Sequence, residues 1–283
     1  MKTIKKFAGF LTILSMICLF GCQPESTQNT DQVVTPKTPK VAPAKNDAHQ
    51  LIRDMIAKVG TMDDLKEMKD VQYTYTYKKS EEAKDVSMER YVFDGESSWA
   101  SYSVHTASLM PGQGGKIVQG YDGENSWMTI DGELATDPKM IKQADFSRKT
   151  NFYWLTMMQK LDDPGLKYEM LDKKDINGVM HDVVKVTFGD GVGDAQDDYI
   201  LAINPKTNLV DEFTFTVRDF GMESPLLMRV KYTDHGDVKL PTYRKYLKLD
   251  DEGNYNDADW IEEICEDLTF GNGFDQSLFK APK

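Results

Sequence analysis

The chain has 283 residues and a formal net charge of -12, because 46 acidic residues outnumber 34 lysines and arginines. An acidic protein repels the phosphate backbone of nucleic acids, so the composition argues against a DNA- or RNA-binding function. It also argues against an electrostatic attachment to anionic lipid, which depends on clustered lysine and arginine.

Residues 1–22 have the pattern of a secretory signal. Three lysines near the start precede an apolar run over residues 7–20, and this order is typical of a cleaved signal peptide. A membrane-spanning helix needs about 20 apolar residues, whereas this run is shorter and contains Thr12 and Ser15. The sequence therefore predicts a cleavable signal and not a membrane span.

The signal ends in Leu19-Phe20-Gly21-Cys22, which resembles the bacterial lipobox. The resemblance implies that Cys22 carries acyl chains, palmitate among them, and becomes the first residue of the mature protein. Two or more such chains anchor a protein stably to a membrane. Because Gln23 is not the aspartate associated with inner-membrane retention, the resemblance favours the outer membrane, at its periplasmic face or at the surface. The alternative is a plain signal peptide with an incidental cysteine.

Residues 23–46 contain four prolines among Thr, Gln, Lys and Asn, with almost no large apolar side chains. Such a composition cannot bury a core and predicts a disordered tether. Residues 47–283 are expected to form one globular domain with its own core. Cys18 leaves with the signal and Cys22 carries lipid, so Cys265 remains as a single thiol, which we expect to be a small buried apolar residue.

Two helices are predicted in this domain. The first starts at Asn46 or Asp47, which can cap it, carries apolar side chains at helical spacing on one face, and ends at Gly60. The second has Asp137 as its N-cap and Pro138 at its first position. Its pattern continues toward Met158.

The remaining apolar residues follow the period of β-strands. Val71, Tyr73, Tyr75 and Tyr77 alternate with polar residues, which is typical of a half-buried strand. Further strands are predicted at residues 86–93, 98–105, 116–121, 125–130, 183–188, 198–203, 209–217, 226–232, 243–249 and 260–270. Their alternation predicts an antiparallel sheet with one covered face, and Asp-Gly or Asn-Gly pairs between them predict hairpins. The fold class is therefore α+β.

Two segments repeat the order aromatic residue, Asp-Gly, tryptophan. They are FDGESSW at residues 93–99 and YDGENSW at residues 121–127. Each is interpreted as a hairpin turn with a tryptophan on the returning strand, which accounts for Trp99 and Trp127 without a ligand.

These hairpins, the leading helix and the ending Phe274-Asp275-Gln276-Ser277-Leu278-Phe279 resemble the LolA-like superfamily of periplasmic and outer-membrane lipoprotein carriers and related lipoproteins. Short motifs within residues 151–242 resemble an uncharacterised bacterial lipoprotein family in that group. The resemblance implies an incomplete antiparallel β-barrel, a strongly curved sheet wrapped around a few helices. It also implies an apolar cavity inside the curve, which in the carriers receives acyl chains.

Aromatic and methionine side chains are the candidates for lining such a cavity. The chain has 15 Met, 13 Phe, 13 Tyr and 4 Trp, and flexible methionines adapt to apolar ligands of varied shape. The candidates are Phe152, Tyr153, Trp154, Leu155, Met157 and Met158 on the second helix, and Phe213 and Phe215 on a strand. The alternative is that this helix fills an ordinary core.

No catalytic residue, cofactor or metal site is expected. His49, His105, His181 and His235 belong to no recognisable motif, and no nucleophile elbow, His-Glu-x-x-His, phosphate loop or dinucleotide fingerprint occurs. Acidic loops at residues 190–198 and 250–259 offer oxygen ligands but lack the spacing of an EF-hand, so we interpret them as solvated loops.

Three hypotheses follow. The first is a membrane-anchored cell-envelope lipoprotein whose apolar cavity binds an acyl chain, a lipid or a lipoprotein. The second is an envelope interaction or scaffold lipoprotein with a filled core and no ligand. The third is a hydrolase or metal enzyme, for which the sequence offers no catalytic constellation.

Overall fold

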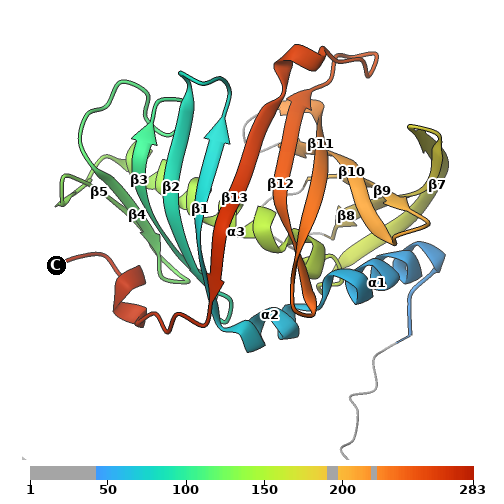
Figure 1. Cartoon of the computed structure of the whole chain (residues 1–283), viewed down its shortest axis with the longest axis horizontal. Coiled ribbons are helices and arrows are strands. Elements are labelled where there is room, and N and C mark those ends of the chain that lie inside the picture. Colours follow the sequence, from blue (N-terminus) through green and yellow to red (C-terminus); the bar gives the residue numbers. More distant parts are fainter. Residues whose placement is uncertain (1–42, 190–196, 218–221) are drawn as a thin grey trace, which may run out of the picture. The chain divides into compact units, whose positions relative to one another are not determined.

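Figure 1 shows the computed structural model of the chain, which describes residues 43–189, 197–217 and 222–283. The predicted signal sequence, Cys22 and residues 23–42 of the predicted tether lie outside these residues, as do residues 190–196 of the first acidic loop. The described part forms one compact unit that begins at Pro43. None of the helices in it is long and apolar enough to cross a membrane.

Both predicted helices are present, and each begins at the predicted cap. In α1 (Asp47–Val59) the Asn46 side chain accepts a hydrogen bond from the His49 backbone, and Gly60 ends the helix with a φ of 87°. In α3 (Pro138–Lys160) the Asp137 side chain accepts from the Lys139 backbone. Side-chain oxygens at these positions satisfy backbone N–H groups that the first helical turn leaves free.

A short helix, α2 (Met62–Met68), was not predicted. It starts with a capping box, in which the Thr61 hydroxyl accepts from the Asp64 backbone and the Asp64 carboxylate accepts from the Thr61 backbone. The Thr-x-x-Asp spacing is the sequence signal that would have found it.

The described strands form one antiparallel sheet of 13 strands in the order β6-β5-β4-β3-β2-β1-β13-β12-β11-β10-β9-β8-β7. They are β1 (Asp70–Lys78), β2 (Lys84–Val92), β3 (Ser97–His105), β4 (Ile117–Tyr121), β5 (Ser126–Ile130), β6 (Glu133–Leu134), β7 (Leu166–Ile176), β8 (Val179–Phe188), β9 (Tyr199–Asn204), β10 (Leu209–Val217), β11 (Met222–His235), β12 (Val238–Lys248) and β13 (Ile261–Phe270). The edge strands β6 and β7 do not pair, so the sheet stays open. The predicted fold class, an incomplete antiparallel barrel around a few helices, is confirmed.

The helices cover one face of the sheet and hold the core there. Figure 1 shows α3 passing behind the central strands, and it packs against β3, β4 and β5 near its start and against β12 further on. Helix α1 packs on α3, β7, β10 and β12. One apolar cluster lies between α1, the end of α3 and β7–β11, and a second lies between α2, α3 and the strands β1, β2, β12 and β13.

Strand β2 carries several polar residues on its inner face. Its polar residues Asp85, Ser87 and Glu89 point inward and are buried, whereas Val86 and Met88 point to the outer face. Alternation alone specifies which residues share a face but not which face is covered. The orientation of β2 places charge inside the curve and apolar side chains outside it.

Candidate functional site

The residues predicted to line a cavity are buried, but they do not form a single group. Trp154, Met157 and Met158 of α3 and Phe213 and Phe215 of β10 lie in the cluster under β7–β11, with Tyr153 half-buried beside it. Phe152 and Leu155 lie in the other cluster. Neighbouring residues of a helix point about 100° apart. The six candidates on α3, although close together in the sequence, are therefore divided between two sides of the helix.

An aromatic group surrounds Trp154. Its ring centroid lies 4.9 Å from that of Phe215, 6.0 Å from Phe213 and 6.5 Å from Tyr199. These tilted and edge-on geometries are favourable for aromatic pairs. Burial raises the pKa of the Tyr199 phenol well above its usual range, so it stays neutral. The concave face of β9–β11 is therefore uncharged and apolar beneath α3.

A buried ion pair fixes the first half of α3 to the sheet. Arg148 pairs with Glu89 of β2, and neither side chain is exposed. Arg148 also donates to the Tyr102 hydroxyl at 2.9 Å and to the Gln119 side-chain oxygen at 3.2 Å. Burial alone would lower the pKa of the Arg148 guanidinium, but the Glu89 carboxylate more than offsets this and raises it. The Arg148 guanidinium is therefore held in its charged form.

Further hydrogen bonds complete the surroundings of Glu89. The Ser87 hydroxyl donates to one carboxylate oxygen at 2.6 Å, and the Tyr91 hydroxyl donates to the other at 3.0 Å. Buried charges are tolerated only when paired and hydrogen-bonded in this way. Sequence reasoning missed this network, although the run of polar residues at alternate positions of β2 was a usable signal.

A second buried arginine contacts α3 further along. Arg244 of β12 donates to Glu263 of β13 at 2.8 Å, to the Pro241 carbonyl at 2.6 Å and to the Trp154 carbonyl at 3.4 Å. Burial works against its charge, but Glu263 prevails and raises the Arg244 pKa. Cys265 lies beside this pair and is buried, as expected, and burial raises the pKa of its thiol to about 11.

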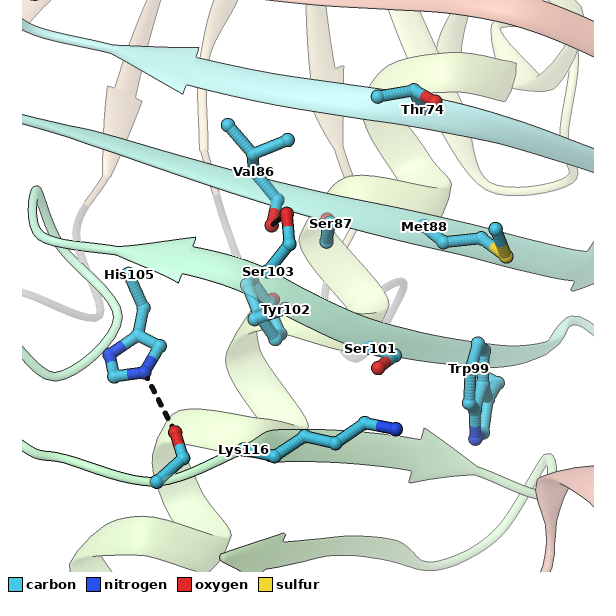
Figure 2. Close-up of a pocket in the computed structure, with 11 residues that line it drawn as sticks. Thr74, Val86, Ser87, Met88, Trp99, Ser101, Tyr102, Ser103, His105 and Lys116 are labelled. Carbon is cyan, nitrogen blue, oxygen red and sulfur yellow. Dashed lines mark hydrogen bonds between the residues drawn. The ribbon is translucent and has the colours of Figure 1, made fainter. Parts of the chain in front are cut away.

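A hollow lies on the opposite face of the sheet, on the outer side of β1–β3 (Figure 2). Its volume is about 710 Å³. The lining residues are Thr74, Val86, Ser87, Met88, Trp99, Ser101, Tyr102, Ser103, His105, Gly115 and Lys116. None of the predicted cavity residues lines it, and sequence reasoning did not identify it.

The hollow exists because β3 separates from β4. The two strands pair only from Ser98 to Ser101, and the pairing of β3 with β2 skips Ser103, whose hydroxyl donates to the Val86 carbonyl at 3.2 Å. Such a bulge bends a strand and disrupts its regular pairing. Beyond it, a 3.1 Å hydrogen bond between the His105 ring and the Gly115 carbonyl joins the two segments, and Figure 2 shows this bond at one end of the hollow.

The two repeated tryptophans lie in one row across the strands at the other end, where Trp99 lines the hollow. Four adjacent strands, β2–β5, carry one residue each at directly opposite positions: Arg90, Trp99, Gly120 and Trp127. A Cβ on Gly120 would lie closer than 3.0 Å to the Trp127 ring, so glycine is required there. These four residues thus form one continuous row across the two repeated hairpins.

The C-terminal segment covers this row. The Trp127 indole donates to the Phe279 carbonyl at 2.7 Å, and Phe279 is fully buried. The Arg90 guanidinium lies 4.8 Å from the centre of the Trp99 ring and 5.2 Å from that of Phe274. The ending motif at residues 274–279 thus packs on the two repeats. It is therefore explained, as they are, by its part in the fold.

The histidines lie apart and have structural partners. His49, at the start of α1, pairs with Asp162 and stacks on Tyr168. His181 contacts the Val179 carbonyl and Asp211, and His235, at the end of β11, contacts the Thr233 hydroxyl. Among the residues that the structure describes, no three His, Cys, Asp or Glu side chains are placed to hold a metal ion.

In the second acidic loop, the Asp250 carboxylate has hydrogen-bond partners within the loop. The Asp250 side chain accepts hydrogen bonds from the backbone of Glu252 at 3.1 Å and of Asn254 at 2.7 Å. This arrangement is typical of aspartate in a turn. Only Asp197 and Asp198 of the first acidic loop lie within the described residues.

Comparison with known proteins gives a family match and a fold match. Residues 113–228, less than half of the chain, match the model of DUF6503, a family of unknown function. No curated protein matches the sequence. A DUF1329 family protein from Desulfovibrio piger is similar in structure with a TM-score of 0.51 at 11% identity, over 82% of this chain and 97% of that one.

Two further solved structures have lower scores. A putative outer membrane lipoprotein-sorting protein domain from Vibrio parahaemolyticus has a TM-score of 0.48 at 10% identity, over 81% of this chain and 94% of that one. A LolA superfamily protein from Nitrosomonas europaea has a TM-score of 0.44 at 11% identity, over 78% and 98%. The match with the DUF1329 family protein is one of overall fold and spans most of both chains. At these identities the likeness is one of fold, as expected from the sequence, and does not extend to function.

Proposed function

We propose that this chain is a membrane-anchored, non-catalytic lipoprotein of the cell envelope that binds an acyl chain, a lipid or a lipoprotein on the concave face of its sheet. The observation that supports the proposal is the apolar surface of β9–β11, which is covered by helices and not by other strands. Envelope location and anchoring rest on the predicted signal sequence and on the predicted lipid at Cys22.

A helical cover can be displaced without damage to the sheet. A helix keeps its backbone hydrogen bonds when it moves, whereas a strand can leave a sheet only by breaking its ladder. Trp154, Met157 and Met158 meet the sheet through apolar contacts. An acyl chain inserted between them and β10 would replace those contacts with similar ones, so its entry has a low cost.

The buried charges indicate which side would open. Breaking the Arg148–Glu89 pair would leave an uncompensated charge inside the protein, at a cost of about 3–5 kcal/mol. The first half of α3 is therefore held against β2, β3 and β4. The apolar contacts under β9–β11 are the part of the interface that a ligand can replace.

The test uses the full chain carrying Cys22→Ser, so that its own lipid does not interfere. Native mass spectrometry identifies apolar molecules that co-purify, and thermal unfolding is followed with fatty acids, phospholipids and lipopeptides. A ligand at about 100 times its dissociation constant should stabilise the protein by ~2.7 kcal/mol. Phe152→Ala is a matched control for Trp154→Ala, because both aromatic residues lie buried on α3 but in different clusters. Only Trp154→Ala should change which ligands stabilise the protein.

The second candidate function is an interaction or scaffold lipoprotein with a filled core. The observation that favours it is burial, since Trp154 is 9% exposed and Phe213 is 2% exposed. In that case no lipid co-purifies, no ligand raises the unfolding temperature, and Trp154→Ala costs the ~3–5 kcal/mol of a packed core residue. This combination of results would replace the lipid-binding proposal.

A further inference from the structure

The outer hollow has an apolar base where a sheet surface would ordinarily be polar. Met88 is 42% exposed, and Val86 and Trp99 beside it are half-buried on the outer face. Single exposed apolar residues are common, but here three of them line one concave surface of about 710 Å³. Sites for small molecules have this size and combine an apolar surface with a few polar groups.

The charge of the hollow is opposite to that of the chain. Its lining includes Lys116 but no aspartate or glutamate, although the chain as a whole has a net charge of -12. Within the described residues the Lys116 ammonium has no ion-pair partner, and Arg90 next to the hollow has only neutral ones, Gln72 and Met88. The positive charge here is available to a ligand.

The positions of the charges define an orientation. Figure 2 shows Lys116 along one long side of the hollow and Thr74 along the other, with Trp99 and His105 at the two ends. Thr74 is paired with Glu266 on the adjacent strand β13, so a carboxylate borders that side. On the Lys116 side the Asp131 carboxylate accepts a hydrogen bond from the Lys116 backbone at 2.8 Å. The Lys116 ammonium is the cationic group among the lining residues, so an anionic group would lie on it.

We propose that this hollow binds a small anionic amphiphile, with its apolar part on Val86, Met88 and Trp99 and its carboxylate or phosphate group on Lys116. The hydroxyl groups of Ser101 and Thr74 border the same surface and can donate to the ligand. This site lies on the opposite face of the sheet from the concave face discussed above, and it does not depend on lipid binding there.

The experiment measures binding at Trp99 in the full chain carrying Cys22→Ser. The four tryptophan indole N–H signals are assigned by single Trp→Phe variants and followed by NMR during titration, below the micelle concentration of each probe. The probes are decanoate, decyl phosphate and decanol, which share an alkyl chain and differ in the head group. We expect decanoate or decyl phosphate to shift the Trp99 signal. Decanol should bind at least about tenfold more weakly, because a charge-assisted contact is lost.

Two substitutions assign the contacts. Lys116→Glu should weaken binding of the anionic probes by at least about tenfold, whereas Lys167→Glu, the same charge change at an exposed lysine on β7, should leave it unchanged. Met88→Ala should weaken binding of all three probes. Equal affinity for decanol and decanoate, an unaltered affinity in Lys116→Glu, or no shift of Trp99 would each overturn the proposal.

The two binding sites are distinguished by their variants. Trp154→Ala changes the concave face and should leave the response of Trp99 intact. Conversely, Lys116→Glu should leave stabilisation by ligands of the concave face intact. A failure at one site is thus recognisable as such and does not decide the other.

Discussion

The Arg148 guanidinium of α3 and the Glu89 carboxylate of β2 form an ion pair in which both side chains have no exposed surface. The pair joins residues 59 positions apart in the chain. It explains why β2 turns its polar residues inward, because Glu89 must face the helix that carries its partner.

Removing one member of this pair should be strongly destabilising. Arg148→Met leaves Glu89 buried and unpaired, and the expected loss is about 3–5 kcal/mol in the free energy of unfolding measured with urea. The double variant Arg148→Met with Glu89→Gln should recover part of that loss, because no uncompensated charge remains. A loss below about 1 kcal/mol for Arg148→Met would contradict a structural role for the pair.

The row of tryptophans should not tolerate a side chain at Gly120. Gly120→Ala places a Cβ against the Trp127 ring and is expected to cost about 1–3 kcal/mol in thermal unfolding. Gly114→Ala is the matched control, because a Cβ there meets no atom within 4 Å. Equal stability of the two variants would mean that Trp127 does not lie over Gly120.

Cys265 predicts a loss of stability at high pH. Burial raises the pKa of its thiol from 9.0 to about 11, so between these values the unfolded chain loses the proton while the folded chain keeps it. The unfolded state is thereby favoured, and stability falls as pH rises through this window, by about 1–3 kcal/mol for this group. Tyrosines with raised pKa values add to the decline. The contribution of Cys265 is therefore the difference in slope between the wild-type chain and Cys265→Ala, and identical slopes would refute it.

Membrane attachment should depend on one sulfur atom. Cys22→Ser is expected to leave the domain folded but to move it from the membrane fraction to the soluble fraction of the periplasm. The acidic domain offers no strong electrostatic attachment in its place. Fractionation and immunoblotting measure the distribution, and retention of the variant on membranes after a high-salt wash would disprove the predicted anchor.

Local sequence patterns predicted helices and strands well where a residue type has a single structural role, such as a helix cap or a hairpin turn. Asp137 before Pro138 located the start of α3, and the Asp-Gly pairs located the hairpins between β2 and β3 and between β4 and β5. Strand β7 was missed because beyond Tyr168 its side chains are mostly exposed and polar, as an edge strand permits.

The sites were harder to predict than the elements. The orientation of β2 is decided by its pairing with Arg148 on α3. The alternating polar residues of β2 indicate that they share a face, but alternation does not say that this face is the covered one. The outer hollow depends on one extra residue at Ser103, which alternation does not reveal. Phe152 and Trp154 were predicted to share a cavity, yet the turn of α3 directs them into different clusters.

The pairing of β1 with β13 in the middle of the sheet has a consequence for biosynthesis. Figure 1 shows these two strands side by side, although β1 is the first strand of the sheet and β13 is the last. The strands β1–β6 and β7–β13 can each pair within themselves as the chain emerges, but the contact between the two sets waits for residues 261–270. Such a distant pairing is slow to form. Until residues 261–270 have been synthesised, β1–β6 and β7–β12 can form only two separate sheets, which leave four strand edges unpaired. Unpaired edges of this kind are prone to aggregation and are bound by chaperones.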